Sequence, residues 1–470
     1  MRFHPRVQVL ACLMAVTVVA GQPATTQAVL PMGLQARIDR AATEVLASTG
    51  VPSASIAVVR DGRIAYVKAY GSARLEPKLP AAPGMRYSIG SISKQFTAAA
   101  LLLLAEEGRL SLDDPVSKYL PGLTGAEGIT LRQLLSHTSG YQDYWPQDYV
   151  MPLMKTPVTA DRILDLWAKK PLDYAPGTKW QYSNTGFVIA GAILEKVSGL
   201  SPFTFLQERI FRPLGMRSVW DSDQRKLTES DAMGYLRHAL GPLRPAPKEG
   251  PGWMYAAGEL AMTAEDLARW DVSVIDRSVL KPDSYREMET EVRLANGAGT
   301  HYGLGIGVAI ENGRRVLRHN GEVSGFTAGN AIYPDDRAAI VVLTNQDAVG
   351  AYGILTNKIA SALFDVQDPD TPKKLDQARK IFEGLQHGTL DRSLFTDNGN
   401  SYFDDTARKD IQASLGPLGA PTAFVQSSQS LRGGMTMRRF RVTFPERKLT
   451  ISTYTMPDGK LEQYMIAPEE

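Results

Sequence analysis

The chain has 470 residues, with 52 Lys and Arg against 50 Asp and Glu, so its formal net charge is +2 at pH 7. This balance does not favour a nucleic-acid partner, and the hydrophobic fraction of 43% is ordinary for a soluble globular protein. The chain is longer than a domain with a single ordinary hydrophobic core, so we expect two domains, or one large composite domain with an appendage.

Residues 1–28 have the parts of a secretory signal peptide. Arg2 and Arg6 precede an apolar core at residues 9–20, which is followed by small and polar residues. The core is too short to span a bilayer, so a cleaved leader is favoured over an uncleaved anchor. We therefore expect a periplasmic or secreted protein without stable membrane insertion after cleavage.

Cysteine usage narrows the chemistry. Cys12 is the only cysteine and lies inside the expected leader, so the mature protein has no disulfide, thiol nucleophile or thiolate metal site. No His-Glu-x-x-His or comparable spacing is present, and we expect neither a metal nor a cofactor.

The region 29–365 predicts one α+β domain. Asp61-Gly62 joins two strand patterns within residues 55–70 and favours a type I′ hairpin. Because strand patterns lie at both ends of the region and helical patterns in the middle, the sequence predicts a single antiparallel sheet with an inserted helical region. The helical patterns are residues 34–48, 91–107, 130–136, 159–168, 185–197 and 352–364, and the later strands are 303–310, 315–319, 325–333 and 338–344.

The C-terminal part predicts a second unit. Residues 366–372 are a polar, proline-containing linker, and residues 373–470 have the length of a small domain. Helical patterns precede alternating strand patterns, which indicates a small α+β accessory domain. The helices are expected at 375–385 and 404–415, and the strands at 422–428, 435–444, 449–456 and 461–466.

Ser91 and Lys94 are the first candidate catalytic residues. If Ser91 lies in the first turn of a helix, Lys94 is on the same face and its amine reaches the serine hydroxyl. The positive end of the helix dipole would favour an oxyanion beside Ser91 and the neutral form of the amine. Taken alone, the spacing equally suits a serine N-cap and a solvated lysine.

Two further stretches carry candidate site residues. Tyr182 and Asn184 are two residues apart, so in an extended segment both side chains point the same way. A tyrosine can relay a proton, and an asparagine can hold a substrate carbonyl. Gly321, two residues after His319, ends a strand pattern and would let a substrate backbone approach closely.

Five stretches, in this order across residues 34–365, resemble the penicillin-binding, β-lactamase-like serine hydrolases, in particular the class C β-lactamase, D-peptidase and esterase branch. Each stretch alone is modest, but together they are specific. They are Tyr87-Ser-Ile-Gly-Ser91-Ile-Ser-Lys94, Ile129-Thr-Leu-Arg-Gln-Leu-Leu-Ser-His-Thr-Ser-Gly140, Pro176-Gly177 leading to Tyr182-Ser-Asn184, Ala256-Ala-Gly-Glu-Leu-Ala-Met-Thr263, and His319-Asn-Gly321.

The resemblance implies that residues 29–365 form a β-lactamase-like α/β sandwich, and it implies a role for each matching residue. Ser91 would attack a carbonyl carbon, with Lys94 and Tyr182 as the proton-handling pair, either of which could be the base. Asn184 would orient the substrate amide or ester. The backbone N–H groups of Ser91 and Glu322 would form the oxyanion hole, worth roughly 3–4 kcal/mol per donor.

His319 stands where most true β-lactamases have a lysine. An imidazole has a reference pKa of about 6.5 and holds a substrate carboxylate poorly at pH 7. This lowers the expectation of efficient β-lactam turnover and leaves an ester, a D-aminoacyl or peptide amide, or a β-lactam as the substrate bond.

A different class of function is a catalytically silent sensor or binding protein of the same fold for peptidoglycan fragments. The intact candidate catalytic residues favour the enzyme. In either case the expected partner is a small-molecule or peptide, peptidoglycan-like substrate, and the sequence does not set the oligomeric state.

Overall fold

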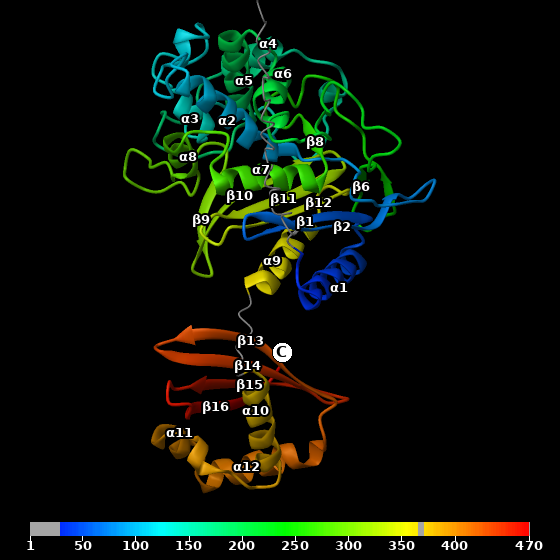
Figure 1. The fold of residues 1–470 in the computed structure, drawn as a ribbon, viewed down its shortest axis with the longest axis vertical. Helices are drawn as coiled ribbons and strands as arrows, with labels where there is room; N and C mark the ends of the chain where they lie inside the picture. Colours follow the sequence, from blue (N-terminus) through cyan, green and yellow to red (C-terminus); the bar gives the residue numbers. More distant parts are fainter. Residues whose placement is uncertain (1–28, 365–370, 470) are drawn as a thin grey trace, which may run out of the picture. The chain divides into compact units, whose positions relative to one another are not determined.

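A computed structural model describes residues 29–364 and 371–469 (Figure 1). The expected leader and most of the expected linker lie outside these residues. The chain divides into two compact units at Phe364/Asp365. Thr371 and Pro372, which were expected to be linker, already belong to the first helix of the second unit.

The first unit is built on a seven-stranded antiparallel sheet. Its central pair joins strands from the two ends of the unit, with Ala57 opposite Val341. This confirms the expected antiparallel sheet with an inserted helical region. The strand order is β3 (Leu79–Pro80), β2 (Arg63–Arg74), β1 (Ser53–Arg60), β12 (Ala338–Thr344), β11 (Phe326–Tyr333), β10 (Arg314–Val323) and β9 (Gly307–Glu311).

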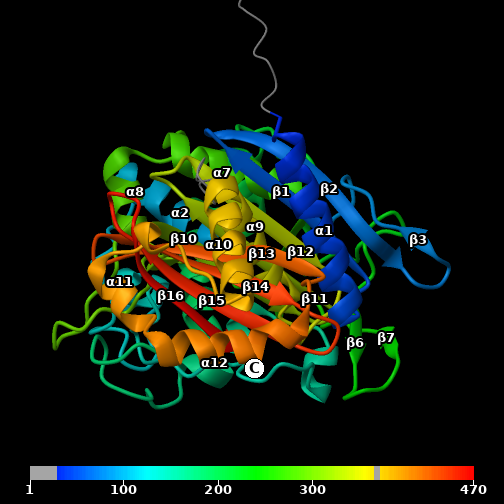
Figure 2. The same cartoon turned by 90° about the horizontal axis from the view of Figure 1, so that it is seen from below.

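Both faces of this sheet are covered by helices. Helices α1 (Met32–Thr49) and α9 (Ala351–Phe364) lie side by side across one face, and α7 (Ala264–Asp276) packs on the other (Figures 1 and 2). The central strands β1, β12 and β11 are therefore buried almost throughout, since alternate residues enter separate cores.

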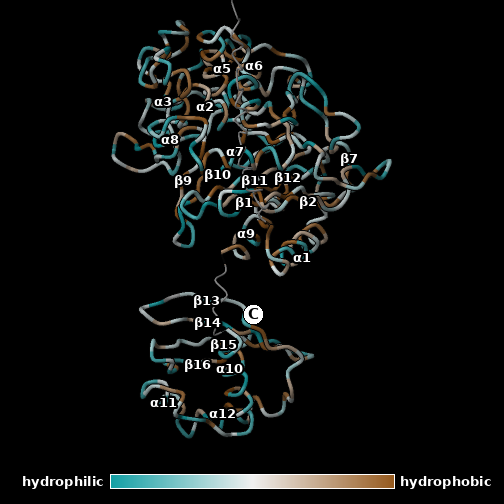
Figure 3. The backbone as a smooth tube through the Cα atoms, in the orientation of Figure 1, coloured by the Kyte–Doolittle hydropathy of each residue, from teal (hydrophilic) through white to brown (hydrophobic). Residues whose placement is uncertain are grey.

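Asp61 and Gly62 both have positive φ, 54° and 73°, as the expected type I′ turn between β1 and β2 requires. Hydrophobic segments gather inside the unit and hydrophilic ones in its outer loops (Figure 3). The conformation of the Asp61-Gly62 turn and the burial of the hydrophobic residues therefore both agree with the fold predicted for this unit.

Helix α2 (Ser93–Glu106) is the centre of the inserted helical region. Every residue from Ser93 to Leu104 is buried, as expected for a helix that is apolar on all sides. The expected helix at 91–107 is a 3₁₀ turn, Gly90–Ile92, followed by α2. Around it lie α3 (Leu131–Leu135), α4 (Ala160–Ile163), α5 (Asn184–Ser198), α6 (Pro202–Leu206) and α8 (Pro282–Glu289), with short strands β4 (Tyr87–Ser88), β5 (Trp220–Asp221), β6 (Tyr235–Arg237), β7 (Leu243–Pro245) and β8 (Leu260–Met262).

Of the helices in residues 29–364 and 371–469, none is by itself long and apolar enough to cross a membrane. Two helical segments joined by a bend, Asn184–Ser198 and Pro202–Phe211, are together long and apolar enough to cross a membrane, judged by length and composition only.

The second unit has its own sheet and its own core. Phe382, Phe440 and Ile451 belong to a separate hydrophobic cluster in which helices pack on a four-stranded sheet. One helix, α11, has no counterpart in the sequence expectation. The elements are α10 (Thr371–Gln386), α11 (Asp397–Tyr402), α12 (Asp405–Leu415), β13 (Ala423–Arg432), β14 (Met435–Thr443), β15 (Lys448–Thr455) and β16 (Leu461–Pro468), with strand order β13-β14-β15-β16.

Candidate active site

Ser91 lies in the 3₁₀ turn that leads into α2, and this turn packs directly on β10. A methyl carbon placed on Gly321 would lie 1.8 Å from the carbonyl oxygen of Ile89, and one placed on Gly90 would lie 2.8 Å from the backbone nitrogen of Glu322. The two glycines therefore let the two backbones touch. This contact brings the backbone segments of Ser91 and Glu322 together, as the expected oxyanion hole requires.

This geometry corrects one expectation. Gly321 was expected to make room for a substrate backbone, but the carbonyl of Ile89 fills that space. β10 also continues through Gly321 to Val323 instead of ending at the glycine. Gly321 is therefore needed so that β10 can pack against the 3₁₀ turn that carries Ser91.

Lys94 is buried and its amine makes three contacts. Nζ lies 3.0 Å from Ser91 Oγ, and it donates to Asn184 Oδ1 at 2.8 Å and to the carbonyl oxygen of Ala257 at 2.7 Å. The two carbonyl oxygens can only accept hydrogen bonds. A neutral amine has two N–H groups and one lone pair, so its lone pair is left for the Ser91 hydroxyl, which can donate.

The electrostatics of Lys94 suit a base. Burial lowers its pKa to about 7, and the nearby charge of Asp143 opposes this shift. An amine with this pKa is substantially neutral at pH 7, whereas an exposed lysine would be almost wholly charged. The distance to Ser91 Oγ, the hydrogen bonds and the burial of Lys94 all suit a role in accepting the proton of Ser91.

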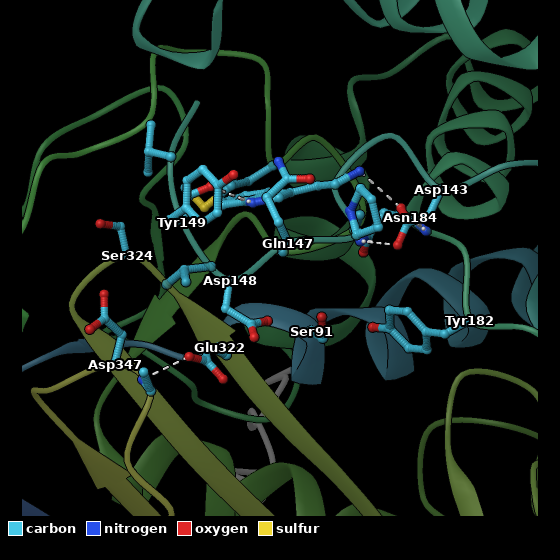
Figure 4. Close-up of a pocket in the computed structure, with 18 of the residues that line it drawn as sticks. Ser91, Asp143, Gln147, Asp148, Tyr149, Tyr182, Asn184, Glu322, Ser324 and Asp347 are labelled. Carbon is cyan, nitrogen blue, oxygen red and sulfur yellow. Dashed lines mark hydrogen bonds between the residues drawn. The ribbon is translucent and has the colours of Figure 1, made fainter. Parts of the chain in front are cut away.

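Tyr182 faces the nucleophile from the side (Figure 4). Its ring lies over Lys94, with Nζ 4.9 Å from the ring centre, and burial raises the pKa of its phenol while the Ser91 hydroxyl opposes this. In the part of the chain that the structure describes, the buried Tyr182 hydroxyl makes no hydrogen bond of ordinary geometry. It is a neutral donor available to a ligand.

Asn184 was expected in an extended segment with Tyr182, but it is the first residue of α5. Ser183, between them, has an extended backbone, and its hydroxyl caps the helix by accepting from Gly186 N at 3.3 Å. Asn184 therefore reaches Lys94 because it begins helix α5, and not because it alternates with Tyr182 along an extended strand.

Asp143, which the sequence analysis did not single out, fixes the Asn184 side chain. Its carboxylate accepts from the backbone N–H of Asn184 at 3.0 Å, from Asn184 Nδ2 at 3.3 Å and from the backbone N–H of Trp145 at 3.1 Å. Burial raises the pKa of Asp143, and these hydrogen bonds and the charge of Lys94 lower it. The carboxylate thus holds the amide with its oxygen towards Lys94.

His319 is buried, and both ring nitrogens have partners. Nδ1 bonds to the carbonyl oxygen of Asn320 and must carry the proton, so Nε2 accepts from the Tyr302 hydroxyl at 2.8 Å. Burial lowers the pKa of His319 to about 3, and the charge of Lys94 acts in the same direction. The ring is therefore neutral and cannot attract a carboxylate as an ammonium would.

His137 supports Tyr182 from behind. Its ring centre lies 4.2 Å from that of Tyr182, and its Nδ1 accepts from the backbone N–H of Ser183 at 3.2 Å. Burial lowers its pKa well below the usual value, so this ring is also neutral.

Ser91 opens into a cavity of about 970 Å³ (Figure 4). Of the other residues predicted for the site, Tyr182, Asn184, His319 and Glu322 line this cavity, while Lys94 and Gly321 lie behind its wall. Sequence reasoning missed Asp143, Tyr302 and the Ala257 carbonyl. Asp143 and Ala257 lie in or just after two of the recognised stretches, whereas no local signal pointed to Tyr302.

Among residues 29–364 and 371–469, no group of three or more His, Cys, Asp or Glu side chains could hold a metal ion. The chemistry available around Ser91 is that of a serine hydroxyl, a lysine amine and a tyrosine phenol. It suits acyl transfer through a covalent serine intermediate.

Comparison with known proteins agrees with this chemistry. Residues 38–362 match the Beta-lactamase family, which covers most of the first unit, and the protein belongs to this family of β-lactamase-fold serine hydrolases. Penicillin-binding protein 4* of Bacillus subtilis (strain 168) is 29% identical over 378 residues, 74% of this chain and 83% of that protein. Protein flp of Staphylococcus aureus (strain MW2) is 28% identical over 324 residues, 67% of this chain and 64% of its own length.

Solved structures with the same fold include two amide hydrolases. A D-stereospecific amidohydrolase from Streptomyces sp. is 30% identical with a TM-score of 0.61, over 70% of this chain and 98% of that one. The D-amino acid amidase of Ochrobactrum anthropi SV3, in complex with D-phenylalanine, is 25% identical with a TM-score of 0.65, over 71% of this chain and all of that one. An octameric penicillin-binding protein homologue from Pyrococcus abyssi, at 23% identity and a TM-score of 0.63, covers 92% of this chain and shows the likeness of fold alone.

Proposed function

We propose that the protein hydrolyses an amide or ester bond through an acyl-enzyme on Ser91. One observation carries the proposal: both N–H groups of a neutral Lys94 are used by carbonyl oxygens, so its lone pair is directed at the Ser91 hydroxyl. A binding protein of the same fold would have no need of an amine kept neutral beside a serine.

The reaction follows from this arrangement. As Ser91 Oγ attacks the carbonyl carbon, its proton passes to Lys94 Nζ, and the negative oxygen is stabilised by the backbone N–H groups of Ser91 and Glu322. The C–N or C–O bond then breaks, and the leaving amine or alcohol takes a proton delivered through Tyr182. A water molecule repeats the attack on the acyl-serine, so one water is consumed and an acid is released.

The charge around Ser91 favours some substrates over others. A β-lactam bears a carboxylate, yet His319, at the position where an ammonium would bind it, is neutral. Esters and D-aminoacyl or peptide amides need no cation there. The amide hydrolases among the structural neighbours support the same preference.

A fluorophosphonate probe tests the covalent step directly. We expect it to label the wild type and to fail on Ser91→Ala, while Ser93→Ala, two residues away in the same helical region, retains labelling. An ester, a D-aminoacyl p-nitroanilide and a cephalosporin should then be compared on both proteins. An unlabelled, folded wild type would favour the silent sensor instead.

We also propose that the protein acts outside the cytoplasm. The support is the leader-like sequence of residues 1–28. Fractionation of cells that express the full chain, followed by N-terminal sequencing, tests this: a cytoplasmic protein with an intact N-terminus would contradict it.

A further inference from the structure

Three carboxylates line the cavity away from the proton-handling residues. Glu322 follows the Gly321 contact on β10, Asp347 lies in the loop after β12, and Asp148 comes from the loop that contains Asp143. Figure 4 shows all three on the side of Ser91 opposite to Tyr182. They form an acidic wall that belongs to three separate segments of the chain.

The acidic wall has no counter-ion. Within residues 29–364 and 371–469, none of the three carboxylates is in an ion pair, and their hydrogen bonds come from backbone N–H groups, from Ala348 to Glu322 at 2.8 Å and from Gly325 to Asp347 at 2.9 Å. Partial burial raises the pKa of Glu322, and the charges of Asp148 and Asp347 raise it further. The three groups therefore repel one another in the empty cavity.

The cations that line the cavity do not neutralise this wall. The guanidinium of Arg237 is turned to the end of α1, where its Nη2 is 3.1 Å from a methyl carbon placed on Gly50. His238 is exposed, and burial raises the pKa of Asp347 although the charge of His238 opposes this. The electrostatic potential in the cavity beside Ser91 is therefore negative.

Two further features of the cavity suit the binding of a ligand. Ser91 opens into the same cavity, which Tyr182 also lines, and the buried Tyr182 hydroxyl makes no hydrogen bond of ordinary geometry in the described part of the chain. Tyr149 on the same wall is 68% exposed, although its ring is large and apolar. An exposed aromatic face next to carboxylates suits an organic cation.

The chemistry of the reaction tells which part of the substrate meets the acidic wall. The leaving group must take a proton, so it departs on the side of Ser91 where Lys94 and Tyr182 lie. The acyl part then extends to the opposite side, towards Asp148 and Glu322. A metal ion is a poor occupant of this wall, because the described residues include no metal-holding group of three acidic or histidine side chains.

We propose that the acyl donor carries a protonated amine, the free α-ammonium of an aminoacyl amide or ester, held by Asp148, Glu322 and Asp347. The inference rests on the proposed function and narrows its substrate class. The enzyme then removes an unblocked N-terminal residue or hydrolyses a simple aminoacyl derivative, and an N-acylated substrate is disfavoured.

The test compares alanine p-nitroanilide with its N-acetyl derivative, for each enantiomer of alanine. In the wild type, kcat/KM for the preferred enantiomer should be at least about tenfold higher with the free amine, the worth of one charge-assisted hydrogen bond. Asp148→Asn and Glu322→Gln should each lower this ratio, and the double variant should bring it towards one. Added salt should lower the ratio in the wild type itself, which needs no variant to fold.

Asp335→Asn is the matched control. Asp335 is an exposed carboxylate in the turn at the other end of β11, so its removal should leave the ratio unchanged. A wild type that hydrolyses the N-acetyl compound equally well, or variants that keep the full preference, would overturn the inference but not the hydrolase. Labelling of Ser91 by the fluorophosphonate without hydrolysis of either compound would also overturn it. Loss of labelling would instead remove the proposed function.

Discussion

Asp143 holds Asn184 by two hydrogen bonds, one from the backbone N–H at 3.0 Å and one from the side-chain Nδ2 at 3.3 Å. These bonds use the donor end of the amide and leave Oδ1 for Lys94 Nζ at 2.8 Å. A carboxylate that does not touch Ser91 thus decides how the base beside Ser91 is hydrogen-bonded. Its charge also favours the protonated form of that base.

Replacing Asp143 by asparagine should affect both the rate and its pH dependence. An asparagine that still accepts the backbone N–H of Asn184 presents its own amide to Nδ2, donor against donor, so kcat/KM should fall by about 10- to 100-fold. The charge that raises the pKa of Lys94 is also lost, and the acidic limb of the kcat/KM profile should move to lower pH. A uniform loss of rate without a shift of the limb would leave Asp143 a merely structural residue.

The wild-type pH profile tests the state of Lys94. In the proposed mechanism the neutral amine of Lys94 is the base, and its pKa is about 7, so kcat/KM should rise with pH up to about 7 and then level off. Rates on one neutral ester across pH 5 to 9, corrected for its spontaneous hydrolysis, give this limb. A limb near the pKa of an exposed lysine, above about 10, would show that burial does not activate Lys94.

Much of this framework could be predicted from the sequence because its signals are local. Strand patterns at both ends of residues 29–365 and the Asp61-Gly62 turn predicted the sheet, and helical spacing placed Lys94 beside Ser91. The contacts of Asp143, Ala257 and Tyr302 could not be predicted, because each comes from a separate segment that reaches the site only through tertiary packing. For the same reason the hydrogen bond between the His319 ring and Tyr302 could not be predicted.

His319→Lys examines the departure from the usual β-lactamase pattern. The ammonium would be buried next to Lys94 and could not accept the hydrogen bond that Tyr302 gives to Nε2. We expect ester turnover to fall by about tenfold or more, since a buried donor is left without its acceptor. Steady-state rates of variant and parent on one ester and one cephalosporin measure this. Unchanged ester turnover with improved cephalosporin turnover would contradict the proposed preference and would favour β-lactamase activity.

The second unit should be dispensable for acylation. All the residues assigned to the chemistry lie within residues 29–364, and residues 371–469 form a separate compact unit with their own core. A 29–364 fragment should therefore still be labelled by a fluorophosphonate at Ser91. If a soluble, folded fragment with native-like circular dichroism were not labelled, the second unit would have to contribute to the site.

Gly321→Ala tests whether the contact between β10 and the nucleophile turn builds the oxyanion hole. The added methyl carbon would lie 1.8 Å from the Ile89 carbonyl oxygen and 3.2 Å from Ser91 N, so one backbone must move. That movement should cost about 1–3 kcal/mol of stability, as overpacking does. It should also separate the N–H groups of Ser91 and Glu322, and loss of one such donor lowers kcat by about 10²–10³-fold.

Gly353→Ala provides the control for this prediction. No atom lies within 4 Å of a methyl carbon placed on Gly353, which is in helix α9, so this change should keep kcat and raise stability by up to about 1 kcal/mol. Thermal unfolding and kcat on one neutral ester should be measured for both variants. A folded Gly321→Ala protein with wild-type kcat would show that the oxyanion is stabilised elsewhere, because β10 cannot hold the extra carbon and keep its present distance from Ser91.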